Sequence, residues 1–130
     1  MRKAIIIGAT TGIGKSLAEK LIREGYLVGI TGRREEMLKI LEENHIGKIL
    51  SMKMDVQDLS SIESICNELV IKLGRLDLLI ISAGIGEENK LLDFSLENNV
   101  IKTNVQGFTC VADWGMNYFK KQEVMDTLLI

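Results

Sequence analysis

The first chemically informative feature of the chain is a glycine-rich segment near the N-terminus. It consists of Gly8, Ala9, Thr10, Thr11, Gly12, Ile13 and Gly14, between an apolar run and a helical pattern. Glycines let the backbone turn tightly and approach a ligand closely, and free N–H groups at a helix start attract a pyrophosphate. The GxxxGxG spacing differs from the GxGxxG dinucleotide fingerprint. We predict a phosphate-binding turn, and the alternative is a glycine-rich turn without a ligand.

A second interpretation of the same segment is the phosphate loop of a nucleoside triphosphatase. Residues 9–16 read AxxxxGKS, whereas that loop begins with glycine. Such an enzyme also needs an apolar strand that ends in Asp to hold magnesium, and the most apolar candidate strand here ends in Ser82. Lys15 and Ser16 are more simply explained as solvated helix residues. The P-loop reading stays as an alternative.

Two arginines follow the second apolar run, in the order Thr31-Gly32-Arg33-Arg34. A carboxylate at this point would accept hydrogen bonds from the ribose 2′-hydroxyl of NAD, whereas arginine suits the 2′-phosphate of NADP. Because Gly32 supplies no carboxylate, the sequence favours NADP over NAD. The alternative for Arg33 and Arg34 is a solvated pair at the start of a helix.

Short apolar runs that alternate with helical patterns must position these groups. The runs cover residues 3–7, 26–31, 48–54 and 76–82. Helical spacing of apolar residues covers about 13–22, 34–44, 60–73 and 95–119, with Ser60 and Glu63 as a capping box for the third helix. This alternation is typical of βαβ units on a parallel sheet, so we predict an α/β fold.

The connections between these elements predict the strand order 3-2-1-4. Crossovers are right-handed, and one reversal of winding opens a crevice at the carboxyl ends of the strands. Polar or glycine residues follow each predicted strand, and they are Gly8, Gly32, Asp55 and Ser82. We therefore expect the functional site along this single edge of the sheet.

Composition excludes several classes of function. The 130 residues are 46% apolar and 26% charged, which fits one soluble globular unit. Sixteen basic against eighteen acidic residues leave a net charge of −2, so neither nucleic acid nor membrane is an expected partner. Cys66 and Cys110 form no disulfide framework and no secretory leader is recognisable, so we expect a cytoplasmic protein. His45 is the only histidine; we expect a helix cap there and no metal site.

Four ordered motifs together resemble the short-chain dehydrogenase/reductase family. They are the glycine segment, Asp55-Val56, Ser82-Ala83-Gly84 and Asn104-Val105-Gln106-Gly107, and the resemblance extends to about Gln122. It implies a Rossmann-like, three-layer α/β/α domain over residues 1–122. By resemblance, Asp55 and Val56 contact the adenine ring, and residues 82–84 stand for the family's Asn-Ala-Gly beside the cofactor. Asn104 matches a helix asparagine that positions a water and the active-site lysine through its backbone, the one catalytic role carried over.

The resemblance implies NADP-dependent interconversion of a small-molecule alcohol and carbonyl, with a Tyr-x-x-x-Lys pair and a serine at the reacting oxygen. That pair is absent, because Tyr26 is followed four residues later by Ile30, and Tyr118 by Gln122. The chain thus resembles only the N-terminal half of the family. The alternative is a non-catalytic dinucleotide-binding fragment.

The segment 123–130 has no recognisable family counterpart, and we interpret it as an atypical tail. Read in another frame, its codons can spell the family's entry into a fifth strand, so a frameshift is one hypothesis that the coding DNA decides. We expect the chain to stop before that strand. Residues 76–82 would then form an exposed edge strand, which favours self-association or a homo-oligomer.

Overall fold

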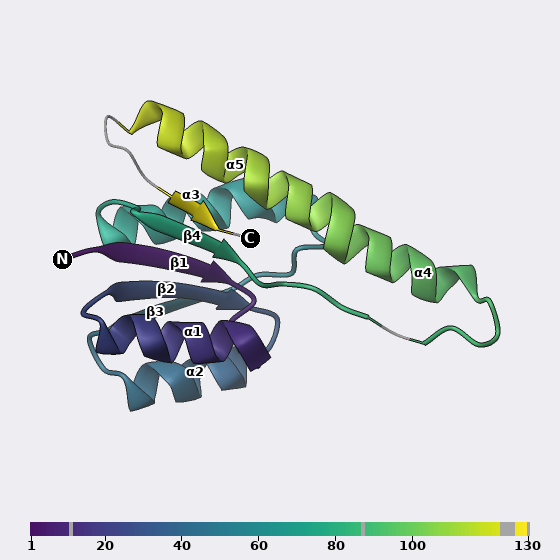
Figure 1. Ribbon diagram of the computed structural model, residues 1–130, viewed down its shortest axis with the longest axis horizontal. Coiled ribbons are helices and arrows are strands. Elements are labelled where there is room, and N and C mark those ends of the chain that lie inside the picture. The colour runs from purple at the N-terminus through teal and green to yellow at the C-terminus, as the bar shows by residue number, and fades with distance from the viewer. Residues whose placement is uncertain (11, 87, 123–126, 130) are drawn as a thin grey trace.

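The computed structural model describes residues 1–10, 12–86, 88–122 and 127–129, the last range by its backbone. They form a parallel sheet covered by helices on both faces (Figure 1). The strands are β1 (Lys3–Ile7), β2 (Leu27–Gly32), β3 (Ile49–Lys53), β4 (Leu78–Ile81) and β5 (Thr127–Leu129). Their order is β3-β2-β1-β4-β5, which confirms the predicted order of the first four strands.

The helices divide between the two faces of the sheet. They are α1 (Gly12–Arg23), α2 (Glu35–Asn44), α3 (Leu59–Leu73), α4 (Phe94–Ile101) and α5 (Phe108–Lys121). Helices α1 and α2 cover one face, whereas α3 and α5 cover the other (Figure 1). The predicted capping box of α3 is wrong, because the helix begins one residue earlier, with Asp58 at its N-cap.

Helices α4 and α5 are joined by a π-helical segment, η1 (Lys102–Gly107), so residues 94–121 form one long rod. The α5 part lies over the sheet, whereas α4 extends beyond it and buries none of its residues (Figure 1). A π-helical turn carries an extra residue, and such turns are frequent at functional sites. Because α5 lies over the sheet and α4 extends beyond it, the segment between them, η1, lies at the edge of the sheet.

The central strand β1 shows why the parallel sheet forms. Ile5, Ile6 and Ile7 are all fully buried, as expected for a strand with helices on both faces. Side chains alternate along a strand, so Ile5 and Ile7 pack into the core under α3 and α5, and Ile6 packs into the core under α1 and α2. Each isoleucine contributes about 1.5–3 kcal/mol of burial free energy, which fixes β1 in the middle of the sheet.

Strand β5 corrects the expectation that the chain stops before a fifth strand. It pairs in parallel with β4, in the register Leu78 with Thr127, Leu79 with Leu128 and Ile80 with Leu129. The long rod crosses the sheet face and returns the chain to the amino end of β4, from which a parallel strand can run. Strand β4 is therefore not an edge strand, and the unpaired edge predicted from the sequence is absent there.

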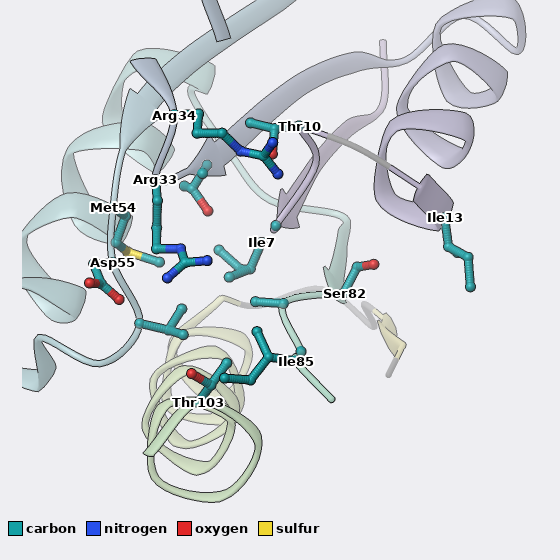
Figure 2. A pocket seen from close by; sticks show the side chains of 16 residues that line it. Ile7, Thr10, Ile13, Arg33, Arg34, Met54, Asp55, Ser82, Ile85 and Thr103 are labelled. Carbon is teal, nitrogen blue, oxygen red and sulfur yellow. The ribbon is translucent and has the colours of Figure 1, made fainter. Parts of the chain in front are cut away.

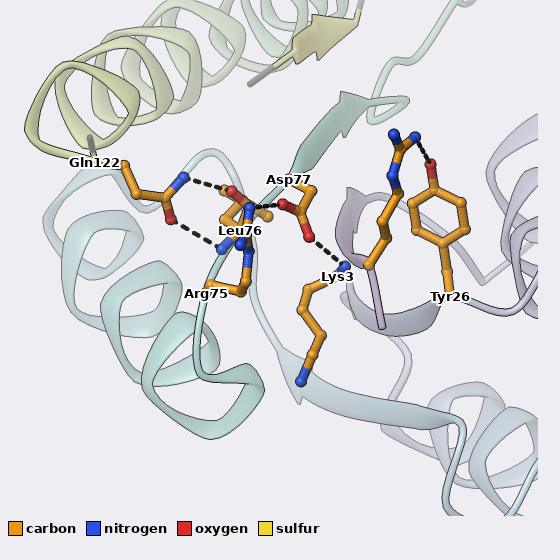
Figure 3. Close-up of polar contacts among 7 residues, drawn as sticks. Lys3, Tyr26, Arg75, Leu76, Asp77 and Gln122 are labelled. Atoms are coloured by element: carbon orange, nitrogen blue, oxygen red, sulfur yellow. Dashed lines mark hydrogen bonds and ion pairs between the residues drawn. The ribbon is translucent and has the colours of Figure 1, made fainter. Parts of the chain in front are cut away.

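A polar cluster fixes the amino end of β4 (Figure 3). Leu76 N–H donates to Gln122 Oε1 at 3.1 Å, and Gln122 Nε2 donates to the Leu76 carbonyl at 2.7 Å. Asp77 accepts from the Lys3 backbone N–H at 2.8 Å and pairs with Arg75. The Gln122 amide thus bonds Leu76 as a neighbouring strand would, just before β5 takes over the pairing.

None of the described helices combines the length and the apolar character needed to cross a bilayer.

Candidate functional site

A pocket of about 260 Å³ opens at the carboxyl ends of the parallel strands (Figure 2). This is where open α/β sheets bind ligands, at the point where the strand order reverses between β1 and β4. The lining residues are Ile7, Gly8, Thr10, Ile13, Thr31, Gly32, Arg33, Arg34, Met54, Asp55, Val56, Ser82, Ala83, Gly84, Ile85 and Thr103. Residues after four different strands therefore meet in one place, as the sequence predicted for this edge.

The turn after β1 is glycine-rich because its backbone is packed on both sides. Gly8 has φ +85°, and a Cβ there would lie 2.7 Å from Cα of Ala83. A Cβ on Gly14 would lie 2.2 Å from the Gly8 carbonyl oxygen, so α1 begins in contact with the end of β1. Gly8 and Ala9 N–H both donate to the Thr31 carbonyl at 3.0 Å. These contacts hold the start of α1 at the sheet edge.

The first turn of α1 is suited to an anion. Gly12 begins the helix with φ +63°, and a Cβ there would meet open space. No acidic residue lies in this turn, so the N–H groups and the positive end of the helix dipole keep their attraction for negative charge. Thr10 is buried and lines the pocket, Ile13 is exposed at its rim, and Thr11 lies outside the described residues.

Arg33 and Arg34 bring positive charge to the end of β2. Both are exposed pocket residues, and neither pairs with an acidic side chain in the described part of the chain. The guanidinium of Arg33 points into the centre of the pocket (Figure 2). A Cβ on Gly32 would lie 2.5 Å from Cγ2 of the buried Thr10, so a carboxylate-bearing residue does not fit at position 32 unless Thr10 moves. The end of β2 is therefore basic, and position 32 does not accept an acidic side chain while Thr10 stays in place.

The loop after β3 forms another wall. Asp55 Oδ1 accepts from Gln57 N–H at 2.9 Å, and Gln57 Nε2 donates to Thr103 Oγ1 of η1 at 2.9 Å. Val56 is buried, and a Cβ on Gly107 would lie 2.6 Å from its carbonyl oxygen. This loop is thus held directly against η1, with Asp55 exposed toward the pocket opening.

The loop after β4 is also held by η1. Ser82 N–H donates to the Ile7 carbonyl at 2.8 Å and extends the β1–β4 pairing into the loop. Ile85 N–H donates to Asn104 Oδ1 at 2.9 Å, and Asn104 Nδ2 donates to the Ile85 carbonyl at 2.7 Å. Gly84 lies next to the same amide, with 3.5 Å between its ideal Cβ and Oδ1. Asn104 itself does not line the pocket and holds the loop that does, and the catalytic role that the resemblance implies for it stays a prediction.

The structure brings together most of the residues predicted from sequence. Those that line the pocket are Gly8, Thr10, Ile13, Arg33, Arg34, Asp55, Val56, Ser82, Ala83 and Gly84. Gly12 and Gly14 shape the turn beside it, and the binding roles of all these residues remain predictions. The lining residues not predicted as binding residues are Ile7, Thr31, Gly32, Met54, Ile85 and Thr103. Each lies within one or two residues of a predicted motif, which is the signal that could have identified them.

Two features decide whether the pocket suits a dinucleotide. Of the buried side-chain polar atoms in the described residues, Thr31 Oγ1 alone has no hydrogen-bond partner, and it belongs to a pocket residue. The pocket also combines two arginines with no acidic partner among the described residues, a helix start without acidic residues in its first turn, and a buried apolar wall of Ile7, Met54 and Val56. The phosphates of a nucleotide would interact with the arginines and with the helix start, and its aromatic base would pack against the apolar wall. The residues present therefore fit a phosphorylated nucleotide.

The remaining sequence candidates lie elsewhere. Lys15 is exposed, with its Nζ 4.0 Å from Glu19 Oε1 on the surface of α1, and neither Lys15 nor Ser16 lines the pocket. The Tyr26 hydroxyl accepts from Arg2 at 3.3 Å at the amino end of β2 (Figure 3), and Tyr118 stacks on Trp114 with 5.7 Å between ring centroids. His45 is the C-cap residue of α2, as predicted.

The sheet order, the glycine turn and the pocket at the strand ends define a Rossmann-like α/β protein. The family model for short chain dehydrogenases matches residues 2–125, and the chain belongs to that family of oxidoreductases. This membership excludes the P-loop alternative.

Individual relatives agree with the family assignment. The chain is 32% identical over 117 residues to the 3-oxoacyl-acyl-carrier-protein reductase FabG of Staphylococcus aureus strain N315, which covers 85% of this chain and 48% of the relative. A short chain dehydrogenase from Bacillus anthracis superimposes with a TM-score of 0.90 at 27% identity, over 98% of this chain and 55% of that one. ElxO with NADP bound gives 0.83 at 30% identity, over 92% and 51%. The chain spans about half the length of these relatives.

Proposed function

We propose that the chain binds NADP(H) in the pocket at the strand ends and forms the cofactor-binding half of an oxidoreductase that interconverts an alcohol and a carbonyl. The observation that carries the choice of NADP is the basic end of β2, where Arg33 and Arg34 have no acidic partner among the described residues and a side chain at Gly32 would clash with Thr10. A relative of known structure holds NADP, and another relative is named as a reductase of a 3-oxoacyl group. Both names support the proposal.

Different residues of the pocket would hold different parts of such a cofactor. The N–H groups at the start of α1 would face the pyrophosphate, and Arg33 and Arg34 would pair with the 2′-phosphate. Asp55 and Val56 would contact the adenine ring, and residues 82–84 would lie along the cofactor. A bound nicotinamide supplies the hydride for the reaction. These residues bind and orient, and the described tyrosines lie outside the pocket.

Titration with NADPH and NADH tests this proposal. Trp114 is a poor reporter, because its Nε1 donates to Asn67 Oδ1 at 2.8 Å between α3 and α5, outside the pocket. The fluorescence of the reduced cofactors is therefore the better signal. We expect NADPH to bind at least about tenfold more tightly, which corresponds to about 1.4 kcal/mol. Equal affinities would contradict the choice of NADP, and no binding of either cofactor would contradict the whole proposal.

Self-association and a cytoplasmic location also remain proposals. The loop before α4 and the first residue of that helix expose three large apolar side chains, Leu91, Leu92 and Phe94. Exposed apolar side chains that cluster in this way favour contact with another surface. Light scattering of the concentrated protein tests self-association, and a monodisperse monomer would contradict it.

A further inference from the structure

The backbone carbonyl of Thr31 accepts two hydrogen bonds, whereas its side-chain hydroxyl has no partner among the described residues. Its carbonyl oxygen accepts from both Gly8 and Ala9 N–H, which fixes the position of the residue at the sheet edge. Its side chain is 1% exposed, yet no described residue hydrogen-bonds Oγ1. Removing a hydroxyl from water without giving it a partner costs free energy. An unpartnered hydroxyl in a pocket wall therefore points to a ligand group that completes its hydrogen bonding.

The direction of the Thr31 side chain follows from the alternation along β2. Gly29 faces α3, because a Cβ there would lie 2.9 Å from Cγ of Leu69. Thr31 is two residues further on, so its side chain points to the same face of the sheet. On this face the pocket is bounded by the buried apolar side chains of Met54 and Val56. Thr31 Oγ1 is thus a polar atom within an apolar wall.

We propose that the Thr31 hydroxyl hydrogen-bonds the edge of the adenine ring of the bound dinucleotide, and that Thr31 is a specificity-determining residue for the base. This inference rests on the proposed function. A flat, neutral ring suits apolar walls, and its edge carries both donors and acceptors, as a hydroxyl requires. A phosphate would be desolvated against Met54 and Val56 and needs a cationic partner, which Arg33 and Arg34 supply from the end of β2 and the Thr31 hydroxyl does not. The base, rather than the phosphate, is therefore the partner of Thr31.

Two probes separate the base from the phosphate. ADP and adenosine 2′,5′-bisphosphate share the adenine ring, and only the second carries a 2′-phosphate. Calorimetric titration of the full chain with each probe gives the dissociation constants. Thr31→Val replaces the hydroxyl by a methyl group of similar size, and we expect it to weaken both probes by the same factor, about three- to tenfold. Thr31→Ser retains the hydroxyl and should bind within about twofold of the unmodified chain.

Thermal unfolding without ligand provides a second readout. Because Thr31→Val removes an unpartnered buried hydroxyl, its melting temperature should equal or exceed that of the unmodified chain, even though its affinity falls. If Thr31→Val does not fold, Thr31→Ala removes the same hydroxyl and permits the same comparison.

The outcomes separate this inference from the proposed function. Unchanged affinity of Thr31→Val for both probes overturns the inference alone, as does a loss confined to the 2′-phosphorylated probe. An unmodified chain that binds NADPH and neither adenine probe also overturns it. An unmodified chain that binds neither NADPH nor either probe overturns the inference together with the proposed function.

Discussion

The side-chain amide of Asn104 bonds both backbone groups of Ile85, as acceptor at 2.9 Å and as donor at 2.7 Å. The pair joins η1 to the loop after β4, and that loop lines the pocket. A residue outside the pocket lining therefore sets the position of residues predicted to contact the cofactor.

Asn104→Ala should reduce the free energy of NADPH binding more than it reduces the free energy of unfolding. Two neutral hydrogen bonds are lost from an exposed site, so we expect the dissociation constant to rise about three- to tenfold, measured by cofactor fluorescence. Gln106→Ala is the matched control, because Gln106 is also exposed on η1. Equal effects of the two substitutions would show that the amide of Asn104 has no positioning role.

Arg33→Asp should exchange the cofactor preference. The substitution replaces a positive charge directed into the pocket by a carboxylate, which repels a 2′-phosphate and accepts from a 2′-hydroxyl. We expect NADPH affinity to fall at least about tenfold while NADH affinity is kept or improved. Lys39→Asp makes the same charge change at an exposed position of α2 outside the pocket, and should leave the ratio unaltered. An unchanged ratio of NADPH to NADH affinity in Arg33→Asp would contradict the proposal that Arg33 selects NADP.

Gly14→Ala should destabilise the fold. Its Cβ would lie 2.2 Å from the Gly8 carbonyl oxygen, a backbone atom that cannot move without shifting α1 or β1. We expect the free energy of unfolding in urea to fall by about 1–3 kcal/mol. Gly86→Ala is the control, since a Cβ there meets nothing within 4 Å, and it should change that free energy by about 0.5 kcal/mol or less. A tolerated Gly14→Ala would contradict the tight contact between helix and strand.

Cys66 should be inert to thiol reagents in the folded protein. Burial, with a smaller contribution from Cys110, raises the pKa of Cys66 to about 12, so almost no reactive thiolate exists at pH 8. In a Cys110→Ser variant, we expect iodoacetamide to modify Cys66 only after urea is added. Rapid labelling of the native variant would show that the thiol is accessible.

The same pKa shift predicts a dependence of stability on pH. The folded state holds the Cys66 proton more tightly than the unfolded state, in which the pKa is near 9.0. The stabilisation is fully present below about pH 9 and is lost as the pH rises toward 12. Urea unfolding of the unmodified chain and of Cys66→Ala should show a steeper alkaline decline for the unmodified chain.

The order of β1 to β4 and the place of the pocket could be predicted because they follow from strong local signals. Apolar runs such as Ile5 to Ile7 identify buried strands, and the handedness of crossovers then fixes their order. Gly8 was identified because it opens a glycine-rich turn between a buried strand and a helix, whereas the binding role of Asp55 came from the family resemblance. Thr31 was not identified, since a threonine inside a strand is an ordinary core residue until its unpartnered hydroxyl is seen.

Contacts between distant segments could not be predicted. Asn104 matched a motif, but nothing in the sequence indicates that its amide meets Ile85. Strand β5 was missed because three residues are too few to show a strand pattern, and its pairing depends on where α5 delivers the chain. The N-cap of α3 is Asp58 rather than Ser60, a choice between two polar residues two positions apart that only the backbone geometry decides.

The two hydrogen bonds between Gln122 and Leu76 hold the beginning of β4 independently of the hydrogen bonds between β4 and β5. Gln122 is the C-cap residue of α5, so its hydrogen bonds to Leu76 come from a helix that packs on the core. Strand β5 pairs with β4 further along, through hydrogen bonds of its own. Local opening of β5 therefore does not release the beginning of β4. Amide hydrogen exchange should accordingly be slower for Leu76, whose N–H is bound to Gln122, than for the residues of β5.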